Sequence, residues 1–184
     1  ERETLLQELY HRTKNNMQVI SSLLNIQSGV MKEEKTSAVL KDMANRINSM
    51  ALVHQKLYQS KSLSAINLKS YTEELVNFLL TAYSSSSRNI LFEFESDDVL
   101  ATIDTAVPYG LVINELVSNA LKYAFDDESG GKISMRMKQR ENRIIDVIFA
   151  DNGKGLPDEF NFRETQTLGM KIITGIIESQ LEGS

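Results

Sequence analysis

The residues best suited to chemistry follow an apolar segment in the second half of the chain. Positions 151–155 read D-N-G-K-G. Two glycines two residues apart let a backbone approach a ligand closely and present its N–H groups. The carboxylate of Asp151, at the end of the expected strand, can accept a hydrogen bond from an exocyclic amine. An ordinary turn accounts for such a segment equally well when it is taken alone, so other residues must decide.

A second polar group is expected on one side of a helix that follows Pro108. Glu115 and Asn119 are four residues apart, and Lys122 follows three residues later. This spacing brings a carboxylate, an amide and an ammonium to one helix face. Amide and carboxylate oxygens suit Mg²⁺, which shares its ligands with phosphates, and the ammonium suits a phosphate oxygen. A solvated polar face is the alternative explanation.

A third candidate stands at the start of the last expected helix, where Gly169 follows Leu168. Glycine lets a loop close over phosphates, and the N-terminus of a helix favours negative charge. Each of these features is modest by itself. Their order along the chain is the discriminating observation: E-x-x-x-N on a helix, two strands, D-x-G-x-G, a loop and then L-G.

The first helix contains a candidate nucleophile, His11. The expected apolar seam of this helix follows spacings of three and four through Leu6, Leu9, Thr13, Asn16, Ile20, Leu23 and Gln27. His11 lies about 200° around the helix from Leu9 and from Thr13, so we expect it to face solvent. A neutral imidazole nitrogen can attack a phosphoryl group, and Arg12, Lys14 and Asn15 can donate hydrogen bonds to the transferred group. An ordinary surface histidine is the alternative. His54 instead falls on the apolar seam of the second helix, which favours a packed histidine.

Helical periodicity dominates the first 60 residues. Residues 3–28 and 35–59 carry apolar side chains at spacings of three and four, and the short connection between them predicts an antiparallel hairpin. Each helix carries more apolar surface than one partner can cover. We therefore expect two hairpins to pack as a four-helix bundle in a homodimer.

Beyond residue 67, helical and alternating segments are mixed. We expect helices at 68–83, 108–124 and 168–180, and strands at 90–95, 101–104, 132–139 and 143–150. The predicted fold class is α+β. An N-terminal antiparallel helical hairpin (residues 1–62) precedes a two-layer α/β sandwich with a mixed sheet (residues 63–184).

Composition narrows the classes of function. The chain of 184 residues has no cysteine, which excludes disulfides, a thiolate metal site and a cysteine nucleophile. Its net charge of −5 argues against nucleic-acid binding. No apolar run approaches the length of a membrane span, and no signal peptide opens the chain. We expect a cytoplasmic protein with no membrane contact from this segment.

The order of the motifs resembles the ATP-binding fold shared by histidine kinases, type II topoisomerases, Hsp90-like chaperones and mismatch-repair ATPases. Residues 114–123 (N-E-L-V-S-N-A-L-K-Y) resemble the N box of histidine kinases, and residues 151–155 and 167–170 resemble their two glycine boxes. The helix around His11 resembles the phosphoacceptor helix of the HisKA_2 family, whose pattern is H-R-x-K-N-N-x-Q. The related HWE family has His-Glu in its N box, whereas this chain has Asn114-Glu115, which favours HisKA_2.

This resemblance implies a sensor histidine kinase of a two-component signal transduction system. Such a kinase transfers the γ-phosphoryl group of ATP to a histidine, here His11, and then to an aspartate of a response regulator. The resemblance makes Asn119 the Mg²⁺ ligand and Glu115 the candidate for positioning or base chemistry at the metal. The implied ATP-binding set is Asn119, Lys122, Tyr123, Asp151, Gly153, Gly155, Leu168 and Gly169.

Two alternatives remain open at this point. One is a dimeric module that binds nucleotide or a response regulator without phosphorylating itself. The other is an ATP hydrolase or protein-serine kinase on the same fold, which the full motif around His11 disfavours.

Arg12 stands where the familiar HisKA helix has an acidic residue, so the identity of the general base is open. The family pattern also continues beyond Ser184 into a hairpin that completes the sheet, and the lack of that hairpin favours the first alternative.

Overall fold

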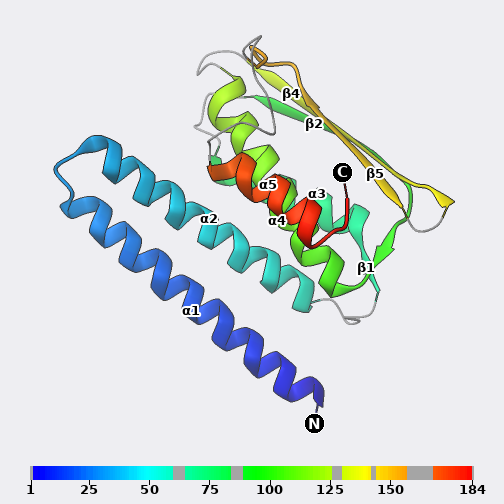
Figure 1. The fold of residues 1–184 in the computed structure, drawn as a ribbon, viewed down its shortest axis with the longest axis horizontal. Coiled ribbons are helices and arrows are strands. Elements are labelled where there is room, and N and C mark those ends of the chain that lie inside the picture. Colours follow the sequence, from blue (N-terminus) through cyan, green and yellow to red (C-terminus); the bar gives the residue numbers. More distant parts are fainter. Residues whose placement is uncertain are drawn as a thin grey trace. The chain divides into compact units, whose positions relative to one another are not determined.

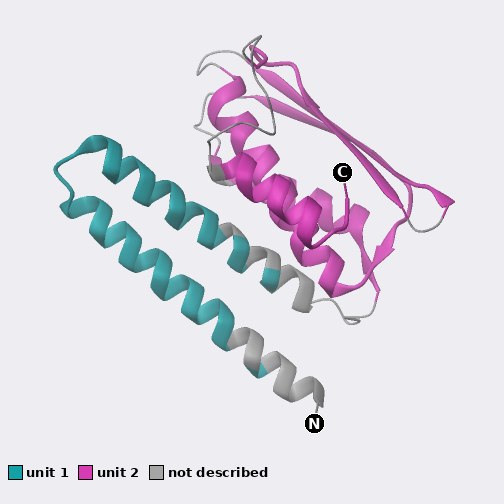
Figure 2. Cartoon of the chain, in the orientation of Figure 1, with its two compact units in different colours: residues 1–63 teal, residues 64–184 magenta. Residues whose placement is uncertain are grey.

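The computed structural model describes residues 2–59, 65–83, 89–125, 130–141, 144–156 and 168–183. The chain divides into two compact units, residues 1–63 and residues 64–184 (Figure 2). The first unit is a pair of helices, and the second combines helices with strands. None of the helices that the structure describes has the length and apolarity needed to cross a membrane.

The first unit is a hairpin of two long helices, α1 (Arg2–Val30) and α2 (Glu34–Gln59), which run antiparallel (Figure 1). Small side chains form its buried contacts. The Ser21 hydroxyl donates to the Ala44 carbonyl at 3.2 Å, and the Ser37 hydroxyl donates to the Ser28 carbonyl at 2.8 Å. Ala44 is fully buried. The two helices therefore approach closely along a row of serine and alanine.

The larger apolar residues of α1 lie elsewhere on the helix. The row that faces α2 contains Ser21 and Ser28, whereas Ile20 and Leu23 of the predicted seam are 47% and 56% exposed. The contact between the two helices is thus shifted by about one position from the seam that the large apolar residues predict. Among the side chains that the structure describes in α1 and the following turn, the large apolar ones that are exposed are Val19, Ile20, Leu23, Ile26, Val30 and Met31.

In the second unit the helices α3, α4 and α5 lie on one face of a sheet (Figure 1). Its elements are β1 (Ile66–Asn67), α3 (Leu68–Tyr83), β2 (Ile90–Ser96), β3 (Leu100–Ala101), α4 (Ile103–Asn119), η1 (Ala120–Ala124), β4 (Gly131–Gln139), β5 (Ile145–Asp151) and α5 (Leu168–Ser179). β1 pairs with β3 antiparallel. The larger sheet has the order β2-β4-β5, with β2 parallel and β5 antiparallel to β4. The predicted α+β fold with a mixed sheet is confirmed.

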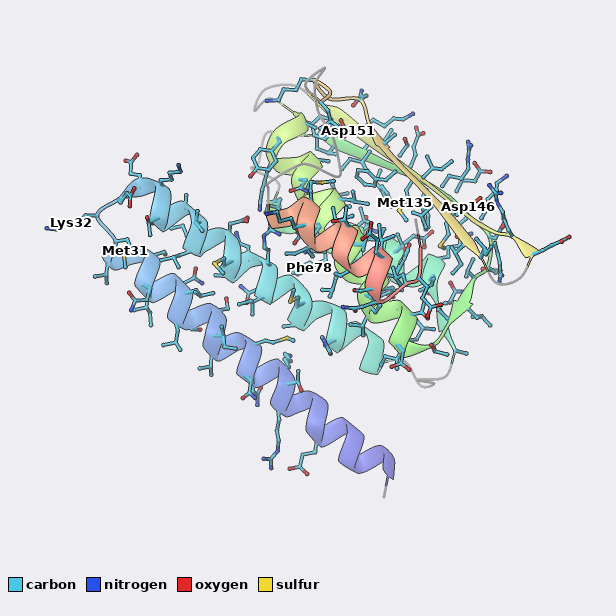
Figure 3. All side chains as sticks on the ribbon, viewed as in Figure 1. Met31, Lys32, Phe78, Met135, Asp146 and Asp151 are labelled. Carbon is cyan, nitrogen blue, oxygen red and sulfur yellow. The ribbon has the colours of Figure 1, made fainter. Side chains whose placement is uncertain are left out.

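The strand register separates an apolar face from a charged face. Met135 of β4 lies opposite Phe94 and Phe149, and it is 3% exposed (Figure 3). On the other face Lys132 pairs with Glu93 at 2.8 Å. Because side chains alternate along a strand, the helices cover the apolar face.

α4 begins earlier than the sequence predicts. The helix starts at Ile103 with Thr102 as its extended N-cap, so Pro108 lies inside it and does not open it. The strand expected at 101–104 is correspondingly shorter, Leu100–Ala101. Pro108 is the sixth residue of the helix, beyond the four N–H groups that have no partner within it, so it leaves the Asp104 carbonyl without its usual helical donor.

Close contacts hold α3 against α4. The Thr72 and Tyr109 hydroxyls form a hydrogen bond of 2.6 Å, and the Tyr71 hydroxyl lies directly over Gly110, where no Cβ would fit. Burial raises the pKa of both tyrosines above its ordinary value. These contacts join neighbouring residues at one level of both helices, so they fix the position of α3 along α4.

Candidate functional site

The end of α4 carries the predicted polar residues, but in two different environments. Glu115 is only 2% exposed, whereas Asn119 one turn later is half-buried. Asn114, beside Glu115, is also 2% exposed, and its side-chain oxygen has no hydrogen-bond partner among the residues that the structure describes. A buried carboxylate and amide are costly unless something engages them. The simple alternative of a solvated polar face is therefore wrong for Glu115.

A π-helical turn, η1, follows Asn119 directly. Such turns are rare and often occur at functional sites. Lys122 lies in this turn, and its Nζ is 5.5 Å from the centroid of the Tyr83 ring on α3. Tyr123, the next residue, is 64% exposed. The turn thus presents an ammonium beside an aromatic ring and a second aromatic ring toward solvent.

The D-x-G-x-G segment contacts the end of this same turn. The backbone N–H of Lys154 donates to the Ala124 carbonyl at 3.0 Å. A Cβ on Gly153 would lie 2.6 Å from the Ala124 Cβ and 2.7 Å from its carbonyl carbon. Gly153 therefore permits a close approach of two protein backbones, whereas the sequence suggested an approach to a ligand. Two motifs about thirty residues apart form one structure.

The rest of the loop is held by its own side chains. The Asp151 Oδ1 accepts a hydrogen bond from the Gly153 N–H at 3.0 Å, and the Asn152 Oδ1 accepts one from the Lys132 N–H at 2.6 Å. Gly155 has a φ of 76°, which favours glycine. Asp151 ends β5, far along the strand from Asp146 (Figure 3). Its register opposite Ile133 places it on the helix-covered face of the sheet.

The third motif is described only in part. Gly169 is buried at the start of α5, whose Ile173 and Ile176 pack against Val112 of α4. Residues 157–167 and the side chain of Leu168 lie outside the described residues. In the described part of the chain, no group of three or more histidine and acidic residues could hold a metal ion. A Mg²⁺ ion needs only one protein oxygen when phosphates and water supply the others, and the half-buried Asn119 amide fits that requirement.

His11 lies within α1, and its side chain is outside the described residues. Of its predicted surroundings, Arg12 and Asn15 are exposed and Lys14 is half-buried. The Arg12 guanidinium pairs with Glu8 at 2.7 Å, one turn toward the N-terminus. The expected solvent exposure of His11 therefore stays a prediction.

The other histidine of the chain, His54, lies on α2 in a partly buried environment. It is half-buried, and desolvation lowers its pKa from the ordinary value of 6.5. This environment agrees with the packed histidine expected from the apolar seam.

Sequence reasoning missed Ala124 and Tyr83. The contact of Ala124 depends on the π turn, and residues 120–124 (A-L-K-Y-A) carry no proline or glycine to signal a break in the helix. Tyr83 was seen only as the end of a helix. An aromatic residue at a helix end that faces a lysine from another helix has no local sequence signal.

Comparisons with known proteins cover residues of both units. Residues 8–83 match the profile of the HisKA_2 family, which is described as histidine kinase. The chain is 30% identical over 184 residues to the sensor histidine kinase PdtaS of Mycobacterium tuberculosis, covering 100% of this chain and 36% of PdtaS. It is 24% identical over 177 residues to the blue-light-activated histidine kinase 2 of Erythrobacter litoralis, covering 94% of this chain and 50% of that protein.

The fold also resembles solved histidine kinase domains. The histidine kinase domain of the Erythrobacter litoralis blue-light-activated kinase EL346 superposes with a TM-score of 0.65, at 21% identity. The superposition covers 96% of this chain and 83% of that domain. The chain is therefore similar to sensor histidine kinases along its length, and the resemblance to HisKA_2 is confirmed for residues 8–83. It spans 36% of the length of PdtaS.

Proposed function

We propose that this chain is the catalytic core of a sensor histidine kinase. It binds ATP, phosphorylates itself on His11 and passes the phosphoryl group to an aspartate of a response regulator. Residues 1–62 are the dimerisation and phosphoacceptor hairpin, and residues 63–184 are the ATP-binding domain. The observation that carries this proposal is the junction of the N box and the glycine loop, where Lys154 donates to the Ala124 carbonyl.

The nucleotide contacts are divided among elements around this junction. Asp151 accepts a hydrogen bond from the adenine amine through the oxygen that Gly153 does not use. Lys122 donates to a phosphate oxygen, and Asn119 holds Mg²⁺. When bound, Mg²⁺ neutralises charge on the phosphates. Positioning and charge neutralisation supply most of the catalysis in phosphoryl transfer, so these residues suffice without an unusual nucleophile.

The phosphoryl acceptor is the neutral imidazole of His11. Its nitrogen forms the N–P bond as the bond between the γ-phosphorus and the bridging oxygen breaks, and ADP leaves. Arg12, Lys14 and Asn15 donate to the oxygens of the transferred group. Arg12 already forms an ion pair with Glu8, which is 2.7 Å away. Since both side chains are exposed, that pair is weak and yields to a phosphoryl group.

The exposed apolar side chains of α1 support a homodimer. Ile20, Leu23 and Ile26 are each at least 47% exposed within one chain. Contiguous apolar patches on a protein surface commonly mark interfaces. A second hairpin that covers them would build a four-helix bundle and place His11 on its outer surface.

The test of the function is incubation with γ-labelled ATP and Mg²⁺, followed by acid. Phosphohistidine is acid-labile, and phosphoserine is not. We expect acid-labile label on the chain and none on the His11→Ala variant, which should still bind ATP because the nucleotide contacts belong to the other unit. Acid-labile labelling of His11→Ala would refute the assignment.

The competing function is a dimeric nucleotide-binding module without kinase activity. It would bind ATP but acquire no label under the same conditions. The same acid step separates the ATP hydrolase and serine kinase alternatives, since the first would release labelled phosphate and the second would retain acid-stable label.

A further inference from the structure

We propose that Tyr83 is a positioning residue that holds the Lys122 ammonium at the nucleotide site through its aromatic ring. This inference rests on the proposed function, in which Lys122 contacts a phosphate. Tyr83 ends α3 and belongs to none of the three nucleotide motifs. Its role would be to act through Lys122 without touching the nucleotide itself.

The geometry of the pair supports an attractive contact. The Lys122 Nζ lies 5.5 Å from the centroid of the Tyr83 ring. An ammonium within about 6 Å of an aromatic centroid is attracted by the electron-rich face of the ring quadrupole. Lys122 and Tyr83 are both half-buried, so water screens this attraction less than it would on an open surface.

Other contacts between α3 and α4 help to place the Tyr83 ring beside Lys122. Tyr71 lies over Gly110, and its neighbour Thr72 bonds to Tyr109. Tyr83 is twelve residues beyond Tyr71, and Lys122 is twelve residues beyond Gly110. Both contacts advance in the same direction along the chain, so the two helices run parallel, and the buried contacts of Tyr71 and Thr72 hold α3 beside the helix whose end carries Lys122.

The contact matters because lysine is a flexible side chain. A lysine that is free to rotate loses considerable conformational entropy when it binds a phosphate. Tyr83 restricts Lys122 in advance, and it does so at the turn whose Ala124 carbonyl receives the Lys154 N–H. The ammonium and the glycine loop are thereby held on one short segment, which lowers the cost of ordering the site when nucleotide enters.

The competing explanation is that Tyr83 only fills space at the end of α3. A ring with a purely packing role would affect all ligands of the domain equally through stability. A positioning role through a cation predicts an effect that depends on phosphate. It also predicts that phenylalanine, which keeps the ring face, replaces tyrosine.

The experiment uses the full chain with Tyr83→Leu, Tyr83→Phe and the matched control Phe78→Leu, which removes an exposed ring from the same helix (Figure 3). Dissociation constants are measured for ATP, ADP and adenosine in the presence of Mg²⁺. We expect Tyr83→Leu to weaken ATP and ADP about two- to fivefold and to leave adenosine unchanged. Tyr83→Phe and Phe78→Leu should bind like the parent chain.

A double-mutant cycle with Lys122→Gln tests whether Tyr83 acts through the lysine. In that background Tyr83→Leu should cause no further loss of ATP affinity. Equal weakening of adenosine, additive losses in the cycle or failure of Tyr83→Phe to restore affinity would each overturn the positioning role.

These binding measurements also distinguish a failure of the Tyr83 role from a failure of the proposed kinase function. If Lys122→Gln weakens ATP and Tyr83→Leu does not, only the role of Tyr83 is refuted. If the parent chain binds neither ATP nor ADP, the proposed function fails and this inference fails with it.

Discussion

Replacing Gly153 with alanine tests the junction on which the candidate site depends. The added Cβ would lie 2.6 Å from the Cβ of Ala124 and 2.7 Å from its carbonyl carbon. Real Cβ contacts are not this short, and the opposing atoms belong to the backbone or its first side-chain carbon, which cannot rotate away. The loop and the π turn must therefore separate.

The cost follows from two parts of the contact. Overpacking a well-fitted site costs about 1–3 kcal/mol. Separation also strains or breaks the 3.0 Å hydrogen bond from the Lys154 N–H to the Ala124 carbonyl, and a hydrogen bond of this kind contributes about 0.5–1.5 kcal/mol. We expect Gly153→Ala to destabilise the second unit by about 2 kcal/mol or more. Backbone strain adds nothing, because among the described glycines only Gly155 has a positive φ.

Gly175→Ala is the matched control. Gly175 lies within α5, and a Cβ there would meet nothing within 4 Å. Alanine in an exposed helical position is favoured over glycine by about 0.5–1 kcal/mol. Glycine-to-alanine substitution should thus lower the free energy of unfolding at Gly153 and raise it at Gly175. A general effect of replacing glycine cannot explain opposite changes.

The assay is urea unfolding of each variant, followed by ATP titration under native conditions. Gly153→Ala should shift the unfolding midpoint downward and weaken ATP, whereas Gly175→Ala should shift the midpoint slightly upward and leave ATP binding unchanged. If Gly153→Ala unfolds within about 0.5 kcal/mol of the parent, the size that ordinary surface substitutions show, the close approach to Ala124 is wrong.

Three further variants test the ligands and the dimer. Asp151→Asn should weaken adenine nucleotides by about 1–3 kcal/mol and barely affect guanine nucleotides, because guanine has a carbonyl where adenine has its amine; equal losses for ATP and GTP in parallel titrations would contradict the adenine contact. Asn119→Ala should nearly eliminate the gain in ATP affinity on adding Mg²⁺ while metal-free binding changes little, and an unchanged Mg²⁺ dependence would remove Asn119 from the metal site. Leu23→Glu places a charge on an apolar surface that is exposed in one chain, so sedimentation should show dissociation of the dimer without unfolding. A parent chain that sediments as a monomer would refute the four-helix bundle.

Helix periodicity predicted much of the fold because most elements obey local rules. The helix expected at 68–83 is α3, Leu68–Tyr83, with the same bounds. For α4 the sequence predicts a start at Pro108, because proline is favoured in the first turn, whereas the helix begins at Ile103. Thr102 and Asp104, an N-cap and an acidic residue in the first turn, were the better signals.

The hairpin contact is harder to predict because the largest apolar residues are not the ones that form it. Large apolar residues such as Leu23 define the most visible seam, yet Ser21 and Ala44 form the close contact between α1 and α2. Small residues allow helix backbones to approach, and their hydroxyls can bond to carbonyls of the neighbouring helix. A pattern based on hydrophobicity alone gives such residues little weight.

The candidate site was predictable in its residue types but not in its construction. The spacing of Glu115, Asn119 and Lys122 indicates one helix face, and that argument assumes an uninterrupted α-helix. The π turn after Asn119 breaks this assumption. Its contacts with Gly153 and Tyr83 join residues that are distant in sequence, so no local pattern could show them.

The path of α4 explains why its polar residues differ in environment. Glu115 and Ser118 are each 2% exposed, Asn119 and Lys122 are half-buried, and Tyr123 is 64% exposed. Ala120 and Leu121 stay buried at the same level, so one side of the helix remains in the core while its polar residues become more exposed over about two turns. The buried carboxylate of Glu115 is shielded from water, so it is suited to hold neighbouring groups in place. The groups at the outer end can reach a solvated triphosphate, and the π turn lies where that change occurs.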